Sequence, residues 1–597
     1  MSRPTNLLYK FGLFLLDTTE QVLLREGRPI PLKPKLFDLL LLLVENSGHV
    51  LHKNELMDRI WPNTSVEESN LTVSIFALRK ALGDCHNNHS YIETVPRRGY
   101  RFVADVIEVP DRGADWLAGN RARLSSKDSE RFAAGADVTC LAVLPFKLIG
   151  AVTDNEYLGL GLADALITKL TSLRQIRVRP TSAVRDYTAA GDITVAGREL
   201  KVDALLDGSI QRARKRIRVT AQLVDARDGA TLWAENFDEK LVDIFSLEDS
   251  LSDQVVRALS LKLTGEERKH LVKRHTESTE AYQAYLKGRY FWNKRTAEGF
   301  NKGVEYFEHA IALDPNYALA YVGLADCYQL LGGYFALPSR EAIPKARKAL
   351  LEALQLDDTL AEAHASLAHL RAREWNWSDA EKEFHRAIEL NPNYVTAHHW
   401  YSIYLKEMGR FDEAWAEIKM AEQLDPVSLN INTSVGALLY LMREYDQALE
   451  QLRATLELDP VYPFAHFNLG MVYEAKEMYH EAIKHYRKTQ TILGKNLELM
   501  AYLAHAYALS GRRGEAQKLL DELKKPSDHG YELRYYIAVI YVGLGEKDQA
   551  FAWLEGAYNE RDEMLGVLKV DPMLDSLRAD PRFTSLLERV GLDPSQN

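Results

Sequence analysis

Residues 68–102 read ESNLTVSIFALRKALGDCHNNHSYIETVPRRGYRF, and this stretch decides the fold of the first part of the chain. In its first half, apolar residues recur at intervals of four, three and four, which places them on one face of a helix: Leu71, Ile75, Leu78 and Leu82. Its second half alternates on both sides of Pro96-Arg97-Arg98-Gly99, as the strands of a β-hairpin do. The stretch therefore predicts a helix followed by a hairpin with two arginines at its tip.

The opposite face of the predicted helix is polar, and its end is basic. Small polar groups near the start of such a helix can reach base edges, while arginine and lysine meet phosphates. Two arginines on a rigid hairpin tip suit a phosphate backbone or a narrow minor groove. The residues that we expect to contact DNA are Asn70, Thr72, Ser74, Phe76, Arg79, Lys80, Arg97, Arg98 and Arg101.

The phrases LRKALGD and TVPRRGYRF resemble the recognition helix and wing of OmpR/PhoB-type winged-helix domains. The preceding residues agree, because 8–32 alternate as short strands, 33–46 predict an apolar helix and 53–61 predict a second helix ended by Pro62. The resemblance covers residues 1–109. It implies double-stranded DNA as a partner, with the 62–69 loop as a candidate contact for RNA polymerase. The alternative is a winged helix that only docks protein.

The charge of this predicted domain is balanced. Residues 1–109 contain 13 Lys/Arg and 13 Asp/Glu, so DNA affinity must come from the local placement of cations. A balanced single module is expected to bind DNA weakly, with a modest dependence on salt. We therefore expect two copies of the domain to act together, as a dimer on a repeated DNA site.

The whole chain has 597 residues, which is too long for one core and predicts three or more domains. Its apolar content of 46% and charged content of 27% are those of a globular protein. The net charge of -11 places the acidic surplus after the first domain. The three cysteines, Cys85, Cys140 and Cys327, have no metal or disulfide spacing and favour a reducing, cytoplasmic setting.

Related CadC/ToxR-like regulators carry a membrane helix after the winged helix. Here the matching residues 110–137 are polar, charged and rich in Gly, Ala and Ser, and they predict a flexible linker. The longest apolar run, residues 39–44, is far shorter than the about 20 residues that span a bilayer. With no visible signal peptide, we expect a soluble protein throughout.

Residues 138–270 alternate between strand and helix patterns. Strands are predicted at 139–146, 176–179, 204–210, 216–225 and 230–237, with helices at 157–173 and 195–200. This order indicates an α/β sandwich, and the fold class of the chain is multidomain α+β. The phrases LAVLPF, LADALITKL, LLDGSI, IRVTAQLVDARDG and LWAENFD resemble TolB-like domains.

Two features of this central region have alternative interpretations. Gly159-Leu160-Gly161 precedes a helix but lacks the third glycine and the Gly-Lys-Ser/Thr ending of phosphate loops, so we expect a packing role. The basic run at 212–218 can hold an anion or nucleic acid, or it can be a solvated hairpin. We favour the hairpin and assign no site to either feature.

The C-terminal half is periodic. Small residues recur every 34 positions at Ala346, Ala380, Ala414, Ala448, Ala482, Ala516 and Ala550. Four positions after each small residue, and after Gly303 in an earlier unit, stands a large apolar residue: Phe307, Leu350, Phe384, Ile418, Leu452, Tyr486, Leu520 and Leu554. Turns such as Asn391-Pro392 and Asp425-Pro426 end the second helix of a unit.

This pattern is similar to tetratricopeptide repeats, with about eight units over 280–572 and a cap or tail over 573–597. The resemblance implies an all-α solenoid whose groove takes a protein or peptide. The aromatic residues Trp375, Trp377, Trp400, Tyr401, Tyr404 and Trp415 either line such a groove or pack between helices, and we favour packing. His398 and His399 lack the spacing of zinc ligands.

The sequence contains no nucleophile elbow, no paired metal ligands and no phosphate loop, so we expect no enzyme and no cofactor. The favoured hypothesis is a bacterial one-component transcriptional regulator whose repeats sense a protein or ligand. The competing hypothesis is a repeat scaffold whose winged helix docks protein partners. A third, resting on analogy alone, is an accessory to a nucleotide cyclase.

Overall fold

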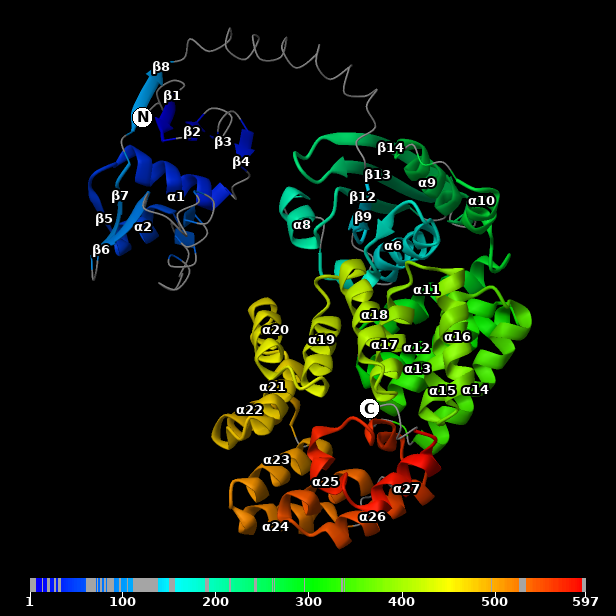
Figure 1. The fold of residues 1–597 in the computed structure, drawn as a ribbon. Coiled ribbons are helices and arrows are strands. Elements are labelled where there is room, and N and C mark those ends of the chain that lie inside the picture. The colour runs from blue at the N-terminus through cyan, green and yellow to red at the C-terminus, as the bar shows by residue number, and fades with distance from the viewer. Residues whose placement is uncertain are drawn as a thin grey trace. The chain divides into compact units, whose positions relative to one another are not determined.

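The computed structural model describes residues 7–110 and 138–592, with gaps at 13, 19–21, 26–27, 31–33, 61–70, 72–73, 76–77, 80–81, 83–90, 96–97, 105, 150–155, 188–192, 214–215, 241–243, 260, 262, 295, 334–336, 338, 495 and 526–532. The chain divides into two compact units, Met1–Gly135 and Ala136–Asn597 (Figure 1).

The first unit begins with an antiparallel sheet in the order β4-β3-β2-β1-β8. Its strands are β1 (Leu7–Phe11), β2 (Phe14–Asp17), β3 (Val22–Arg25), β4 (Arg28–Ile30) and β8 (Ile107–Pro110). The helices that follow are α1 (Pro34–Glu45) and α2 (Lys53–Ile60), as the apolar periodicity predicted. A second sheet, in the order β5-β7-β6, contains β5 (Val50–His52), β6 (Ile92–Val95) and β7 (Gly99–Phe102). The predicted hairpin is confirmed, whereas β5 and β8 were not predicted.

The second unit starts with a mixed sheet in the order β11-β9-β12-β13-β14, with β10 beside β12. Its strands are β9 (Cys140–Val143), β10 (Lys147–Ile149), β11 (Arg177–Val178), β12 (Ala204–Ala213), β13 (Arg216–Asp225) and β14 (Thr231–Lys240). Its helices are α6 (Glu156–Thr171), α7 (Thr181–Val184), α8 (Ile193–Leu200), α9 (Ile244–Ala258) and α10 (Gly265–Val272). We call residues 138–273 the central domain. Every predicted strand and helix of this domain is present, and β10, α7, α9 and α10 are additional.

The glycines at 159–161 and the basic run at 212–218 both have structural roles. Gly159 lies in α6 so close to the preceding strand region that an added Cβ would be 2.2 Å from the carbonyl oxygen of Phe146. The glycine therefore permits close packing, as predicted. Arg216 and Arg218 are exposed on the β12–β13 hairpin and form ion pairs with Asp238 of β14 at 2.9 and 2.7 Å. The described part of the basic run is a solvated hairpin.

The rest of the unit is an array of helix pairs (Figure 1). Within the described residues there are eight pairs: α11 (Thr279–Asn293) with α12 (Ala297–Leu313), α13 (Ala318–Gly333) with α14 (Ser339–Leu356), α15 (Ala361–Arg373) with α16 (Trp377–Leu390), α17 (Val395–Glu407) with α18 (Phe411–Leu424), α19 (Leu429–Leu441) with α20 (Tyr445–Leu458), α21 (Pro463–Ala475) with α22 (Tyr479–Leu493), α23 (Leu497–Leu509) with α24 (Arg513–Leu523), and α25 (Arg534–Leu544) with α26 (Lys547–Asn559). All seven periodic alanines are fully buried, because they lie where two helices approach closely. The predicted repeat architecture is confirmed.

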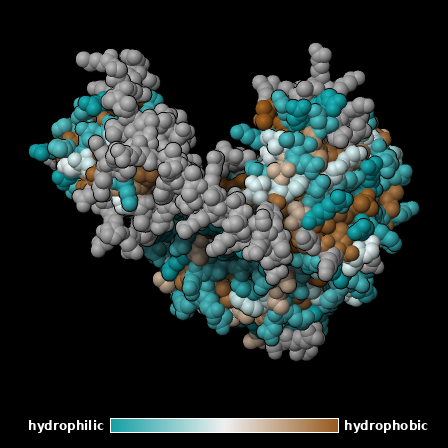
Figure 2. Space-filling view, turned by 90° about the horizontal axis from the view of Figure 1, so that it is seen from above, coloured by the Kyte–Doolittle hydropathy of each residue, from teal (hydrophilic) through white to brown (hydrophobic). Residues whose placement is uncertain are grey.

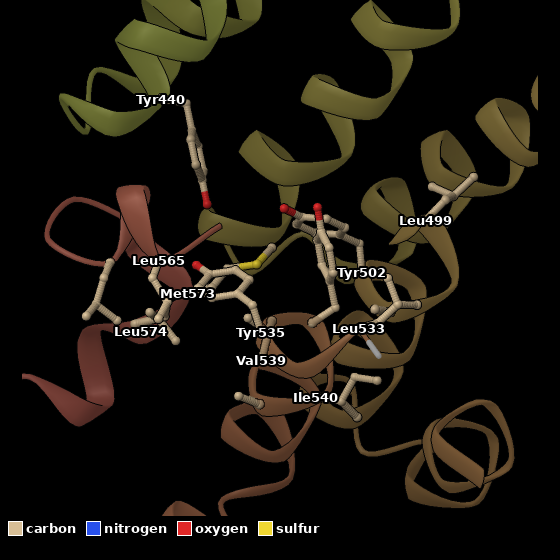
Figure 3. Packing of buried hydrophobic residues seen from close by; sticks show 14 of the residues in the cluster. Tyr440, Leu499, Tyr502, Leu533, Tyr535, Val539, Ile540, Leu565, Met573 and Leu574 are labelled. Atoms are coloured by element: carbon tan, nitrogen blue, oxygen red, sulfur yellow. The ribbon is translucent and has the colours of Figure 1, made fainter. Parts of the chain in front are cut away.

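The last residues return to the middle of the array. They form η3 (Glu563–Val567), η4 (Pro572–Leu577) and α27 (Pro581–Val590), which we call the C-terminal segment. The indole of Trp377 donates to the carbonyl of Val590 at 2.9 Å, and the ammonium of Lys569 donates to the carbonyl of Met408 at 3.2 Å. Figure 3 shows Leu565, Met573 and Leu574 of this segment in one cluster with tyrosines of the array. The segment thus joins the last repeat to repeats far earlier in the chain.

The central domain rests on the array through a buried arginine. Arg179, just after β11, donates from Nε to the carbonyl of Leu200 at 2.8 Å and from Nη2 to that of Lys201 at 2.7 Å, at the end of α8. Its Nη1 donates to the carbonyls of Gln423 and Leu424 at 2.7 Å each, at the end of α18. A cation between two helix C-termini is favourable because the partial charges there are negative. One guanidinium therefore links the central domain to the repeats.

Turns of successive repeats make further contacts with the central domain. Lys273 donates to Asp357 at 2.6 Å, and Asn393 donates to the carbonyl of Leu173 at 3.0 Å. Ser182 donates to the carboxylate of Asp425 at 2.9 Å. Burial raises the pKa of Asp425 to about 6. The central domain thus covers one edge of the array along three successive turns.

On the side of the molecule shown in Figure 2, hydrophobic areas lie among hydrophilic ones. None of the helices in the described ranges combines the length and apolar character needed to cross a membrane.

Candidate DNA-binding site

The recognition helix is held by its apolar face. Residues 71, 74–75 and 78–79 are helical where the structure describes them. The four residues of the predicted inner face are buried, with exposed fractions of 0–3%: Leu71, Ile75, Leu78 and Leu82. They belong to the core of the first unit, together with residues of α1 and of the hairpin. The prediction that this face packs inward is confirmed.

The hairpin that follows is packed against the first sheet at its base. Phe102 of β7 packs edge-on against Phe11 with ring centroids 5.1 Å apart, and Tyr91 packs edge-on against Phe14 at 5.4 Å. At the tip, Gly99 lies against β5 so closely that an added Cβ would be 1.8 Å from the carbonyl oxygen of Leu51. This glycine therefore lets β5 pair with β7 of the hairpin.

The structure describes four of the nine predicted DNA-binding residues. Ser74 is half-buried, and Arg98 is exposed in the hairpin turn, where its backbone N–H donates to the carbonyl of Val95 at 3.1 Å. Arg79 and Arg101 are described below. The other five lie outside the described residues: Asn70, Thr72, Phe76, Lys80 and Arg97.

Arg79 and Arg101 already have partners within the domain. Arg79 donates from Nε and Nη2 to the carbonyl of Ile92, at 3.1 and 2.8 Å, and from Nη2 to the hydroxyl of Thr94 at 2.7 Å. It therefore ties the recognition helix to the first strand of the hairpin. Arg101 forms an ion pair with Glu93, its cross-strand neighbour, at 2.6 Å. The helical spacing of residues 71–82 could not predict the partners of Arg79 and Arg101, because these partners lie on the hairpin.

Elsewhere, the aromatic residues of the array pack as we favoured. Trp400 stacks on His369 with ring centroids 4.6 Å apart, and Trp375 stacks on Tyr558 at 5.9 Å. His398 is buried and bonds Glu417 at 2.5 Å. In the described parts of the chain, no group of three or more His, Cys, Asp or Glu side chains is placed to hold a metal ion.

Comparison with known families identifies three parts of the chain. Residues 27–102 match the family described as "Transcriptional regulatory protein, C terminal". Residues 137–254 match "HilA/YgeH-like transcriptional regulator, second domain", and residues 437–495 match "Tetratricopeptide repeat". The predicted OmpR/PhoB-type winged helix and the tetratricopeptide repeats are therefore confirmed.

Three curated relatives illustrate the range of similar proteins. Transcriptional regulator HilA of Salmonella typhimurium is 23% identical over 415 residues, which cover 68% of this chain and 69% of that protein. Transcriptional activator CadC of Escherichia coli is 38% identical over 99 residues, 16% of this chain and 19% of CadC. Putative adenylate cyclase 3 of Rhizobium meliloti is 30% identical over 232 residues, 38% of this chain and 39% of that protein. The matched winged-helix family is one of transcriptional regulators.

Proposed function

We propose that this chain is a one-component transcriptional regulator that binds a specific DNA sequence through its winged helix. One observation supports the proposal best: the recognition helix is packed by its apolar face while the arginine hairpin beside it is exposed at Arg98. A helix fixed in this way can enter a major groove, and the hairpin tip can then reach the neighbouring backbone or minor groove. All nine residues predicted from the sequence are proposed to contact DNA.

In this proposal Arg79 and Arg101 also position the DNA-contacting elements. Their guanidinium groups hold the hairpin against the helix and across its own strands, so they set the angle between the two DNA-contacting elements. Arg101 can still contact a phosphate, because its side chain is 38% exposed. Substituting Arg79 is therefore expected to affect domain stability as well as DNA affinity.

The remainder of the chain is proposed to be the sensing part. The central domain resembles TolB-like domains. Together with the repeats, it would respond to a protein or peptide partner and set the spacing of two winged helices on DNA. The 62–69 loop remains a candidate contact for RNA polymerase, and the protein is expected to act in the cytoplasm. The alternative is a repeat scaffold with a docking winged helix, favoured by the zero net charge of residues 1–109.

The test is selection of genomic DNA fragments by the purified full-length protein. Arg97→Ala with Arg98→Ala should weaken specific binding about 10- to 100-fold and reduce the salt slope by about two phosphate contacts. A matched control is Arg216→Ala with Arg218→Ala, two exposed arginines on a hairpin of the central domain. Equal specific binding by the hairpin-tip variant and the wild type would refute the regulator proposal, and random recovery of fragments at several salt concentrations would favour the scaffold.

A further inference from the structure

The repeats offer an internal comparison, because equivalent positions are 34 residues apart. At the end of α18, Leu424 is fully buried and Val427 packs against the core that the central domain shares with the array. The equivalent residues at the end of α20 are Leu458 and Val461, and they are 56% and 60% exposed. The two turns thus carry apolar residues at equivalent positions. The central domain covers the turn after α18 and leaves the turn after α20 uncovered.

The uncovered turn belongs to a larger apolar surface. Phe464, at the start of α21, is 46% exposed. Lys488 and Thr489 of α22 donate to the carbonyls of Pro460 and Pro463 at 3.4 and 3.3 Å, which places the end of α22 beside this turn. There, two further large apolar side chains are 39% and 44% exposed. We call the following residues the uncovered edge: Leu458, Val461, Phe464, Ile492 and Leu493.

Exposed apolar groups gathered in this way are a mark of interaction sites, since single scattered ones need no explanation but a contiguous set does. The uncovered edge also continues the row of turns that already forms an interface with the central domain. Its surface is therefore of a kind that this protein buries against another folded domain.

Charges beside the uncovered edge indicate the kind of partner. On balance the exposed charges of α20 are acidic, with Asp446, Glu450 and Glu457 against Arg453. Those of α22 are basic, with Lys484, Arg487 and Lys488, although Lys484 already pairs with Glu481 at 3.3 Å. Glu450 and Lys484 occupy the same position in successive repeats, so the edge has an acidic side and a basic side. In a two-fold interface the same surface meets itself, and the acidic side of one copy then faces the basic side of the other. The arrangement is self-complementary.

We infer that the uncovered edge is the interface through which two copies of this chain form a dimer, with α20 of each copy against α22 of the other. The apolar residues form the centre of this interface and the exposed charges of α20 and α22 form its rim, as in known protein interfaces. The dimer itself does not depend on DNA. Its consequence, that two winged helices are brought to one repeated DNA site, rests on the proposed function.

Sedimentation of the full-length protein without DNA tests the interface. We expect a mass of twice 67.8 kDa for the wild type and a monomer for Leu458→Glu with Val461→Glu, whose dissociation constant should rise about 100-fold. The control is Leu351→Glu on α14, which replaces a leucine that is 49% exposed outside the uncovered edge and should leave the dimer intact. Circular dichroism and thermal melting establish that each variant is folded.

Charge reversal tests the proposed pairing directly. Glu450→Lys and Lys484→Glu should each weaken the dimer about tenfold, and the two together should restore it. A wild type that is monomeric up to about 100 μM would overturn the inference and leave the edge to a different protein. So would a dimer that is unaffected by Leu458→Glu with Val461→Glu in a folded protein. A DNA-binding monomer would overturn the interface alone, whereas a dimer without sequence preference would overturn the proposed function alone.

Discussion

Replacing Arg179 with methionine should loosen the central domain from the repeat array. Methionine occupies a similar volume but removes the charge and the four hydrogen bonds to carbonyls of α8, α18 and their ends. A hydrogen bond contributes about 1 kcal/mol net, and an unpaired buried acceptor costs at least as much. Lys201 and Gln423 are exposed, so their carbonyls can regain water, and the two bonds to the buried residues Leu200 and Leu424 remain to be counted. The expected loss is therefore about 2 kcal/mol.

Hydrogen exchange measured by mass spectrometry would locate this loss. Peptides covering the end of α18 and the end of α8 should exchange about 30-fold faster in Arg179→Met, because the substitution lowers the free energy of opening the interface by about 2 kcal/mol. Arg177→Met is the matched control, since Arg177 lies two residues away in β11 and is exposed. If the two variants exchange alike at both helix ends, or if the faster exchange is confined to β11, the guanidinium does not hold the domains together.

Two further predictions concern the same unit. Gly159→Ala should destabilise the protein by about 1–3 kcal/mol, because its Cβ would meet the backbone of Phe146, whereas Gly265→Ala, with open space around the new Cβ, should be neutral or slightly stabilising in thermal melting. For Asp425, a folded-state pKa raised to about 6 means that the folded protein binds more protons than the unfolded chain between about pH 4 and 6. The free energy of unfolding should therefore fall by at most about 3 kcal/mol as the pH rises through this window. Urea unfolding of Asp425→Asn at several pH values should lack this contribution to the pH dependence. Equal pH slopes for the wild type and Asp425→Asn would contradict the assignment.

Local periodicity was sufficient to predict most elements of this fold. The alanines spaced by 34 residues are all fully buried, because a repeat forces the same close approach of helices in every unit. The inner face of the recognition helix was equally predictable, because four apolar residues at helical spacing must be buried together. Helix α9 also carries a readable pattern, with Leu247, Leu251 and Val255 spaced by four and all buried, but it was not predicted.

What local pattern could not predict are contacts between distant segments. Strand β8 is short and ends in Pro110, and it pairs with β1 at the opposite end of the domain sequence. Arg79 has the spacing of a DNA-facing residue, yet the structure gives it backbone and hydroxyl partners on the hairpin. Arg179 bonds carbonyls more than 240 residues away, and any residue type can supply a carbonyl. No sequence pattern marks such an acceptor.

The distribution of these long-range contacts bears on where the array can accept a partner. A solenoid changes its curvature by small rotations between neighbouring repeats. Here the central domain bonds the turns at Asp357, Asn393 and Asp425, which resists rotation among the early repeats. The C-terminal segment bonds Met408 and Trp377 from the far end of the array, which resists opening of the later ones. An array held at both ends is poorly suited to closing around a peptide, whereas its outer turns can bind without any change of curvature. The uncovered edge is such a set of turns, and this makes it the part of the array where we expect the second copy of the chain to bind.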